Sequence, residues 1–157
     1  NCTNLIELDL IGSSIQNVNG LAKCTNLTKL DLSYCDSLQN VDGLDNCTNL
    51  TNLNLSSCGR LQNLDGLTNL TEITILDLKD CGSLKTMDGL TKCTKLTNLI
   101  LSDCSSLQNV SGLVGCTGLK FLNLRACSRV SPKPTPVVME NRGQVALYQE
   151  KIKNSMK

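Results

Sequence analysis

Leucine recurs along most of the chain in one fixed pattern. Each copy has the order L-x-x-L-x-L-x-x-C, as in Leu27, Leu30, Leu32 and Cys35, and the same order returns after 23 residues. The alternation in L-x-L has a period of two, which predicts one short strand per copy with its leucines on a single side. A pattern with so long a period, kept over several copies, indicates a protein built from stacked repeats.

Six copies cover residues 1–131, and the last of them is truncated. The first copy begins at Cys2, is one residue shorter than the others and lacks the second cysteine. The remaining copies begin at Cys24, Cys47, Leu70, Cys93 and Cys116. One copy alone cannot bury its leucines, whereas stacked neighbours bury them for each other. We therefore predict a solenoid over residues 1–131, followed by a proline-rich connector and a short C-terminal helix over residues 132–157.

The segments that connect successive strands contain a recurring turn signal. An Asp-Gly pair recurs in three copies, at Asp42-Gly43, Asp65-Gly66 and Asp88-Gly89. We expect a turn there in which glycine accepts a positive φ. The returning segment is rich in Ser, Gln, Asn and Gly, which favours a short 3₁₀ turn over a full helix. Its few apolar residues, such as Leu38, Val41 and Leu44, would then pack from the convex side.

The L-x-x-L-x-L-x-x-C pattern resembles the leucine-rich repeat family, whose signature has Asn or Cys at the last position. The segment S-L-Q-N-V-D-G-L that follows (Ser37–Leu44) is similar to the short units of the internalin and phosphatase-regulator class, while the cysteine resembles the cysteine-containing class. The resemblance covers about residues 1–130. It implies an α/β solenoid, a right-handed superhelix with a parallel β-sheet on the concave face and short 3₁₀ turns on the convex face.

All 10 cysteines occupy two positions of the repeat. Five follow the strands (Cys35, Cys58, Cys81, Cys104 and Cys127), and five precede them (Cys2, Cys24, Cys47, Cys93 and Cys116). Leu70 stands where a sixth would be, which indicates a small buried apolar site. We predict two interior rows of free thiols. A disulfide framework is the alternative, but side chains of one row point the same way, which suits disulfide geometry poorly.

Free thiols favour a reducing compartment, so we expect a cytoplasmic protein. Seven N-x-[ST] sequons support this expectation, because glycans on them would lie in packed turns or on the sheet. One of them, at Asn54, would project from the middle of the sheet. A surface or secreted protein of a bacterium is the alternative.

The tail departs from the repeat. Three prolines, Pro132, Pro134 and Pro136, predict an extended connector. Val145, Tyr148, Ile152 and Met156 then recur at helical spacing. We expect this helix to cap the last repeat, with a free linker or a partner-binding helix as alternatives. The first repeat shows no cap, so we expect further chain upstream.

Composition excludes several classes of function. The chain has no His, which removes the usual general base and the usual zinc ligand, and no clustered C-x-x-C pairs replace it. Asp77, Asp80 and Asp103 could at most hold a cation weakly, on an open sheet. Lys plus Arg is 15 and Asp plus Glu is 14, a balance that predicts neither nucleic-acid nor membrane binding. We predict no enzyme activity and no cofactor.

The exposed positions of the strands vary between copies, while the leucines do not. Ile75, Ile100 and Phe121 fall on such positions in consecutive repeats, and they would form a small apolar patch. The candidate partner-binding residues are this patch and its charged border: Ile75, Asp77, Ile100, Asp103, Lys120, Phe121 and Arg125. An apolar centre inside a charged rim is typical of binding hot spots.

Three alternatives to this site remain. The C-terminal helix could cover the patch through Tyr148 and Ile152, or the exposure could be chance, because single apolar residues are common on surfaces. The third alternative is a site on the acidic N-terminal half, around Glu7, Asp9, Asp31 and Tyr34.

We therefore expect a protein–protein interaction module, monomeric as this fragment, that binds a protein partner through the concave sheet. One alternative is a structural or adhesive repeat segment of a surface protein. The other is the substrate-recognition part of a larger enzyme.

Overall fold

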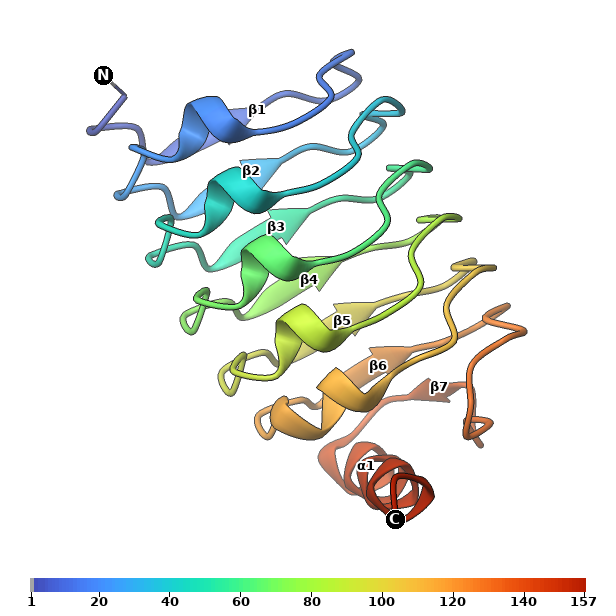
Figure 1. Ribbon diagram of the computed structural model, residues 1–157. Coiled ribbons are helices and arrows are strands. Elements are labelled where there is room, and N and C mark those ends of the chain that lie inside the picture. The colour runs from blue at the N-terminus through green and yellow to red at the C-terminus, as the bar shows by residue number, and fades with distance from the viewer. Residues whose placement is uncertain (1) are drawn as a thin grey trace.

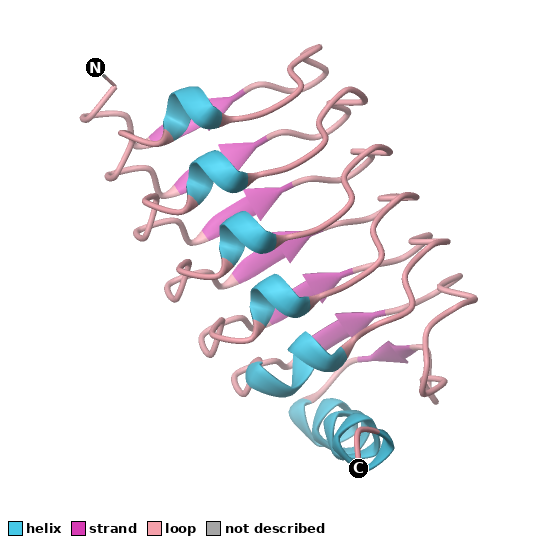
Figure 2. Ribbon diagram, viewed as in Figure 1, coloured by secondary structure: helices cyan, strands magenta, loops and turns pink. Residues whose placement is uncertain are grey.

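The computed structural model describes residues 2–157 and shows a stack of short strands facing a stack of short helical turns (Figures 1 and 2). The strands are β1 (Glu7–Asp9), β2 (Lys29–Asp31), β3 (Asn52–Asn54), β4 (Ile75–Asp77), β5 (Asn98–Ile100), β6 (Phe121–Asn123) and β7 (Val138–Met139). The 3₁₀ turns are η1 (Asn19–Leu21), η2 (Asp42–Leu44), η3 (Asp65–Leu67), η4 (Asp88–Leu90) and η5 (Ser111–Gly115), and the tail forms α1 (Arg142–Ser155). The predicted α/β solenoid with 3₁₀ turns is confirmed.

Strands β1 to β6 are parallel, and each residue pairs with its equivalent in the next repeat. The central leucines therefore form one line: Leu8, Leu30, Leu53, Leu76, Leu99 and Leu122. From Leu30 onward these side chains are buried against the leucines of the return segments. Leu8 is only half-buried, because within residues 2–157 no repeat packs on its outer side.

Side-chain hydrogen bonds repeat with the same period. The hydroxyl of Thr51 donates to the Thr28 carbonyl at 3.0 Å, and Thr74 and Thr97 each donate to the threonine carbonyl one repeat earlier. These bonds lie where the chain enters each strand. They tie successive repeats together beside the backbone ladder, so that burial and register support each other.

The glycines of the Asp-Gly turns are required for a reason other than the predicted one. Gly43, Gly66 and Gly89 do not have positive φ. A β-carbon at any of them would instead overlap a backbone carbonyl of the preceding repeat, for example that of Val41 beside Gly66. Glycine is needed here because the 3₁₀ turns stack backbone on backbone.

Left-handed backbone occurs elsewhere, at the residue that precedes each post-strand cysteine. These residues are Tyr34, Ser57, Asp80, Asp103 and Ala126, with φ between 59° and 67°, and Gly12 in the first repeat. A side chain strains this conformation. The N–H of such a residue donates to the next repeat, as Tyr34 does to the Ser56 carbonyl at 2.9 Å. Inter-repeat bonding therefore holds the first five repeats in this turn, whereas the Ala126 N–H has no such bond among residues 2–157.

The ten cysteines are free thiols, and all but Cys2 are buried. In the row after the strands each thiol donates to a leucine carbonyl of the preceding repeat, as Cys81 does to Leu55 at 3.2 Å. The predicted interior rows are confirmed for the nine buried residues. Cys2, in the first described repeat, is exposed.

The tail closes the C-terminal end of the solenoid. Strand β7 pairs antiparallel with β6, and α1 packs against η5, β6 and β7 (Figure 1). Val145, Tyr148 and Ile152 are buried there, as the helical spacing predicts, while Met156 lies beyond the helix and is exposed. The buried Gln149 amide donates to the Leu113 and Cys116 carbonyls at 2.6 and 3.0 Å. The predicted cap on the last repeat is confirmed.

Candidate functional site

The sheet face is the side of strands β1 to β6 that points away from the leucine core. Two rows of side chains occupy it. The first row is Glu7, Lys29, Asn52, Ile75, Asn98 and Phe121, and the second is Asp9, Asp31, Asn54, Asp77, Ile100 and Asn123. Each strand contributes the residues on either side of its inward leucine, so the sequence pattern alone sets both rows.

The predicted apolar patch is staggered over these rows. Ile75 and Phe121 share the first row but lie two strands apart, with Asn98 between them. Ile100 belongs to the second row, between Asp77 and Asn123. Ile75 is 42% exposed, whereas Ile100 and Phe121 are half-buried.

The C-terminal helix does not cover this patch. Among the residues the structure describes, α1 contacts η5, β6 and β7, and it makes no contact with β4 or β5, which hold Ile75 and Ile100. Tyr148 is turned to the tail, where its hydroxyl donates to the Pro132 carbonyl at 2.7 Å. The alternative of a patch covered by Tyr148 and Ile152 is therefore wrong for Ile75 and Ile100, whereas Phe121 lies on β6, which α1 contacts.

The predicted charged border is spread along the strands. Lys120 precedes β6 and Arg125 follows it, so the two exposed cations lie at opposite ends of that strand. Asp103 follows β5 in the left-handed turn, and its N–H donates to the Arg125 carbonyl at 2.9 Å. The structure thus brings Asp103 and Arg125 together and leaves Lys120 apart.

Most second-row residues also form a hydrogen bond that stabilises the loop after their strand. A side-chain oxygen accepts a hydrogen bond from the N–H two residues later at Asp9, Asp31, Asn54, Asp77 and Asn123, over 2.8–3.0 Å. This turn directs the chain out of the strand. Asp77 therefore has one carboxylate oxygen bound to its own loop, which sequence reasoning did not anticipate. Ile100 is the member of the row that cannot form this bond.

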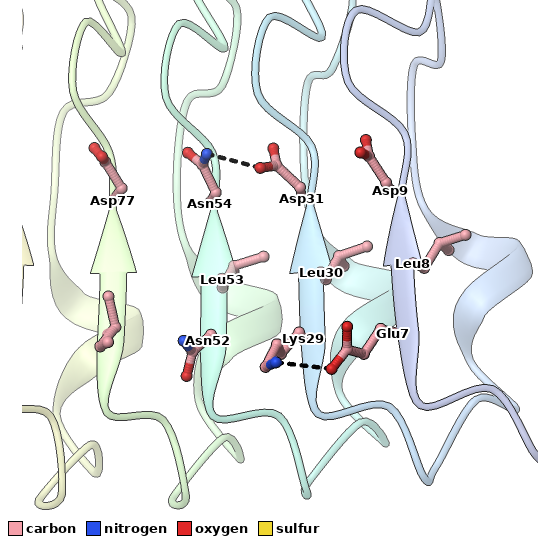
Figure 3. A pocket seen from close by; sticks show the side chains of 11 residues that line it. Glu7, Leu8, Asp9, Lys29, Leu30, Asp31, Asn52, Leu53, Asn54 and Asp77 are labelled. Carbon is pink, nitrogen blue, oxygen red and sulfur yellow. Dashed lines mark hydrogen bonds and ion pairs between the residues drawn. The ribbon is translucent and has the colours of Figure 1, made fainter.

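A groove of about 530 Å³ lies on the N-terminal half of the sheet face (Figure 3). Its walls come from both rows of β1 to β4, with Ile75 and Asp77 at one end. Lys29 donates to Glu7 at 2.7 Å, and the Asn54 amide donates to Asp31 at 3.0 Å. Lys29 and Glu7 are more than half exposed, so this ion pair adds little stability.

Sequence reasoning placed the main site on the C-terminal half of the sheet face, whereas the groove lies on the N-terminal half. The groove contains residues of the acidic N-terminal alternative, namely Glu7, Asp9 and Asp31, but not Tyr34, which lies outside it and is 62% exposed. Lys29, Asn52 and Asn54 also line the groove but were not among the candidates, although their row positions place them on the sheet face. Ile75 and Asp77 are the two candidate residues that line the groove as well.

Burial determines the reactivity of three thiols in the interior rows. Burial raises the pKa of Cys58, Cys81 and Cys116 to about 12, so these thiols stay protonated and are poor nucleophiles. No three His, Cys, Asp or Glu side chains gather into a metal-binding group within residues 2–157. Asp77, Asp80 and Asp103 accordingly do not form the weak cation site considered above.

A family model describes this arrangement. The model of the leucine-rich-repeat domain of the endo-beta-N-acetylglucosaminidase EndoS matches residues 5–88, more than half of the chain. The chain belongs to this leucine-rich-repeat family. Beyond the matched residues, the leucine-rich-repeat ladder continues with unchanged parallel pairing through β5 and β6. No curated protein matched the sequence.

Two solved leucine-rich-repeat structures share the fold. An internalin C2 from Listeria monocytogenes aligns with a TM-score of 0.66 at 24% identity, over 80% of this chain and 54% of that one. A leucine-rich-repeat protein of Leptospira interrogans aligns with a TM-score of 0.57 at 19% identity, over 80% of this chain and 38% of that one. The chain thus spans about half the length of the internalin and a smaller share of the Leptospira protein. Within residues 2–157 no helix combines the length and the apolar character needed to cross a bilayer.

Proposed function

We propose that this leucine-rich-repeat solenoid is an interaction module that binds a protein partner through its sheet face. One observation supports it above the others: the buried positions of each strand are the same leucines, while the exposed positions between them change from repeat to repeat. The first row alone passes through carboxylate, ammonium, amide, isoleucine and phenyl groups. A constant frame with a variable surface is what selective recognition needs.

The proposed contact residues are the seven predicted from the sequence. Ile75, Ile100 and Phe121 supply apolar area at the centre, and the charges of Asp77, Asp103, Lys120 and Arg125 border it. The groove on β1 to β4 continues from Ile75 and Asp77, so a longer partner segment would extend into it. Buried apolar or aromatic anchors with a polar rim account for most binding energy in protein interfaces.

The test is affinity capture with three forms of the chain. The intact protein, the double variant Phe121→Ala with Ile100→Asn, and Gln62→Ala are immobilised at equal density. Gln62 is exposed on the return segment between β3 and η3, so it serves as the matched control. We expect a protein that the intact chain and Gln62→Ala retain and the double variant loses. Equal retention by all three forms would place binding elsewhere.

The family match favours a second candidate. Because the matching model describes the leucine-rich-repeat domain of a glycan-cleaving enzyme, the solenoid could serve as the substrate-recognition part of a larger enzyme. The two candidates differ in what the captured protein must present. If enzymatic removal of glycans that contain N-acetylglucosamine abolishes capture, the second candidate is favoured, and if capture persists, it is excluded.

We also propose that the protein works in a reducing, cytoplasmic compartment. The support is nine buried free thiols in rows that leave no room for added groups. Protein purified without reductant is treated with a thiol reagent, first native and then denatured. We expect slow labelling of the native form and nearly complete labelling of all ten thiols after denaturation. Two or more disulfides found by mass analysis would overturn the assignment.

A further inference from the structure

Charge is distributed unevenly along the solenoid. Three of the 15 Lys and Arg residues but nine of the 14 Asp and Glu residues lie within residues 1–78, so the side chains of this half have a net charge of −6. Residues 79–157 hold the other 12 cations and five carboxylates, a net charge of +7. The near-neutral total therefore combines two halves of opposite sign, and a partner that lies along the solenoid meets a different field on each.

The groove on the sheet face presents part of the negative charge of the first half. Four carboxylates and one ammonium line it: Glu7, Asp9, Asp31, Asp77 and Lys29. The ammonium of Lys29 is already paired with Glu7 at 2.7 Å. Within residues 2–157 no cation forms an ion pair with Asp31 or Asp77. The groove therefore has carboxylates that the described chain does not neutralise.

Asp31 on β2 and Asp77 on β4 have defined surroundings, because each of these strands lies between two described strands. Both carboxylates are half-buried in the second row, with Asn54 between them (Figure 3). Their hydrogen-bond donors are neutral, namely the Ser33 N–H and the Asn54 amide for Asp31 and the Lys79 N–H for Asp77. Neutral donors leave the charge uncompensated, so a cation that approaches either carboxylate gains a charge-assisted bond.

The sheet face changes from charged to apolar in the direction from β1 to β6. Ile75 and Asp77 lie on β4, where the groove ends. Beyond the groove both rows of β5 and β6 are uncharged, and these strands contribute Ile100 and Phe121. A segment that lies across the strands meets carboxylates at one end and apolar side chains at the other.

We propose that the groove receives a lysine- or arginine-bearing segment of the partner protein, whose apolar residues follow on Ile75, Ile100 and Phe121. The proposal rests on the proposed function of the sheet face and adds the chemistry and the direction of the bound segment. Asp31 and Asp77 lie two strands apart, about 10 Å at the usual strand spacing, so two cations of one segment reach both. An acidic or uncharged segment would leave both carboxylates without a counter-ion, which disfavours such partners.

The test removes the two charges and keeps the bonds to the loops. Asn54 and Asn123 occupy the same row and accept the same hydrogen bond, each at 3.0 Å, from the N–H two residues later. The double variant Asp31→Asn with Asp77→Asn therefore retains an acceptor oxygen for each loop. Denaturant unfolding checks that its fold is intact.

Asp42→Gln with Asp65→Gln is the matched control, because it removes the same charge from exposed positions of η2 and η3, away from the sheet face (Figure 2). A library of random peptides is selected on the intact chain and on both double variants. We expect enrichment of Lys and Arg on the intact chain and on the control, and none on Asp31→Asn with Asp77→Asn. A peptide selected on the intact chain should bind that variant about fivefold more weakly at low salt, and added salt should reduce the difference.

Three results would overturn the proposal. The first is equal enrichment of Lys and Arg on all three forms, and the second is enrichment of acidic peptides on the intact chain. The third is self-association of the intact chain in sedimentation that Asp31→Asn with Asp77→Asn abolishes, because a second copy would then be the occupant. Failure of the proposed function gives a different result. If Phe121→Ala with Ile100→Asn abolishes partner capture while the charge variant binds like the intact chain, the chemistry proposed for the groove fails and the proposed function stands.

Discussion

The two faces of the β1–β6 sheet are built from the same strands under opposite constraints. The inner face packs on the leucine core, and the outer face is the sheet face defined above. On the inner face each repeat has leucine, which from the second repeat onward is buried in the core, and the thiols beside these leucines donate to carbonyls of the preceding repeat. On the outer face Asn52 sits between Lys29 and Ile75, three side chains with no common chemistry. Packing in a solenoid therefore fixes one face and leaves the other available for recognition.

The division between a face that maintains the fold and a face that is free to vary is incomplete. Asp31 and Asp77 lie on the outer face, yet each uses one oxygen to hold the loop that follows its strand. The first row has no such bonds to its own loop. First-row side chains are thus less constrained by the fold than second-row side chains. Substitutions in the first row should therefore separate effects on binding from effects on folding most cleanly.

Alkaline pH should affect the inner face most. Burial raises the pKa of Cys58 and Cys81 from 9.0 to about 12 and that of Cys93 to about 11. A thiol whose pKa is raised by folding contributes its full stability below the unfolded pKa, and loses it as pH rises toward the folded value. We expect the free energy of unfolding to fall from about pH 9 upward, by about 1.4 kcal/mol per pH unit for each such thiol.

Urea unfolding followed across this pH range measures the slope. Cys81→Ala is the matched control, because it removes one buried thiol and should lower the slope by one thiol's share. Stability that stays constant between pH about 9 and 12 would mean that water reaches the thiols.

Replacing a central leucine should lower the free energy of unfolding by less than the combined alkaline loss of the thiols. Leu53→Ala and Leu76→Ala each leave a cavity between two repeats, and each should lower the free energy of unfolding by about 2–5 kcal/mol. Denaturant unfolding monitored by circular dichroism measures the loss. Leu8→Ala is the internal control, since Leu8 is half-buried and should cost less.

Gly66→Ala probes the backbone stacking of the turns. Its β-carbon would overlap the Val41 carbonyl, so the repeats must shift apart, which should cost about 1–3 kcal/mol. Gly20→Ala, with open space around it, should be close to neutral. If thermal unfolding gave equal midpoints for the two variants, glycine would not be needed for stacking.

Asn52→Ala should have the smallest effect. The side chain is half-exposed on the first row, and its loss should change the free energy of unfolding by at most about 0.5 kcal/mol. Its neighbour Leu53 points inward, so the pair reports the register of the strand. A loss at Asn52 as large as that at Leu53 would reverse the assignment of inner and outer faces.

Much of the fold is predictable from the sequence because one pattern specifies each repeat. The leucine spacing predicts the strands, their burial and their parallel stacking, and the polar return segment predicts the 3₁₀ turns. The reason for Gly66 was not predictable, since backbone overlap with Val41 exists only after the repeats stack. Strand β7 was missed because its pairing with β6 depends on tertiary contact alone.

The candidate site was predictable in outline. Row positions correctly identified Ile75 as exposed, and the registers place Ile100 and Phe121 on the same face. Their partial burial depends on neighbouring side chains, which a repeat pattern does not describe. The second use of Asp77, as a hydrogen-bond acceptor for its own loop, likewise depends on the local backbone.

The outer face is proposed to bind a partner, while the inner face maintains the fold. The direct measurement is the dissociation constant of the captured partner, by calorimetry, for the intact chain and for Phe121→Ala with Ile100→Asn. We predict a binding loss of at least about 2 kcal/mol, with a folding loss of about 1 kcal/mol or less. An unchanged dissociation constant in a folded double variant would contradict the claim and move the site to the groove around Glu7, Asp9 and Asp31.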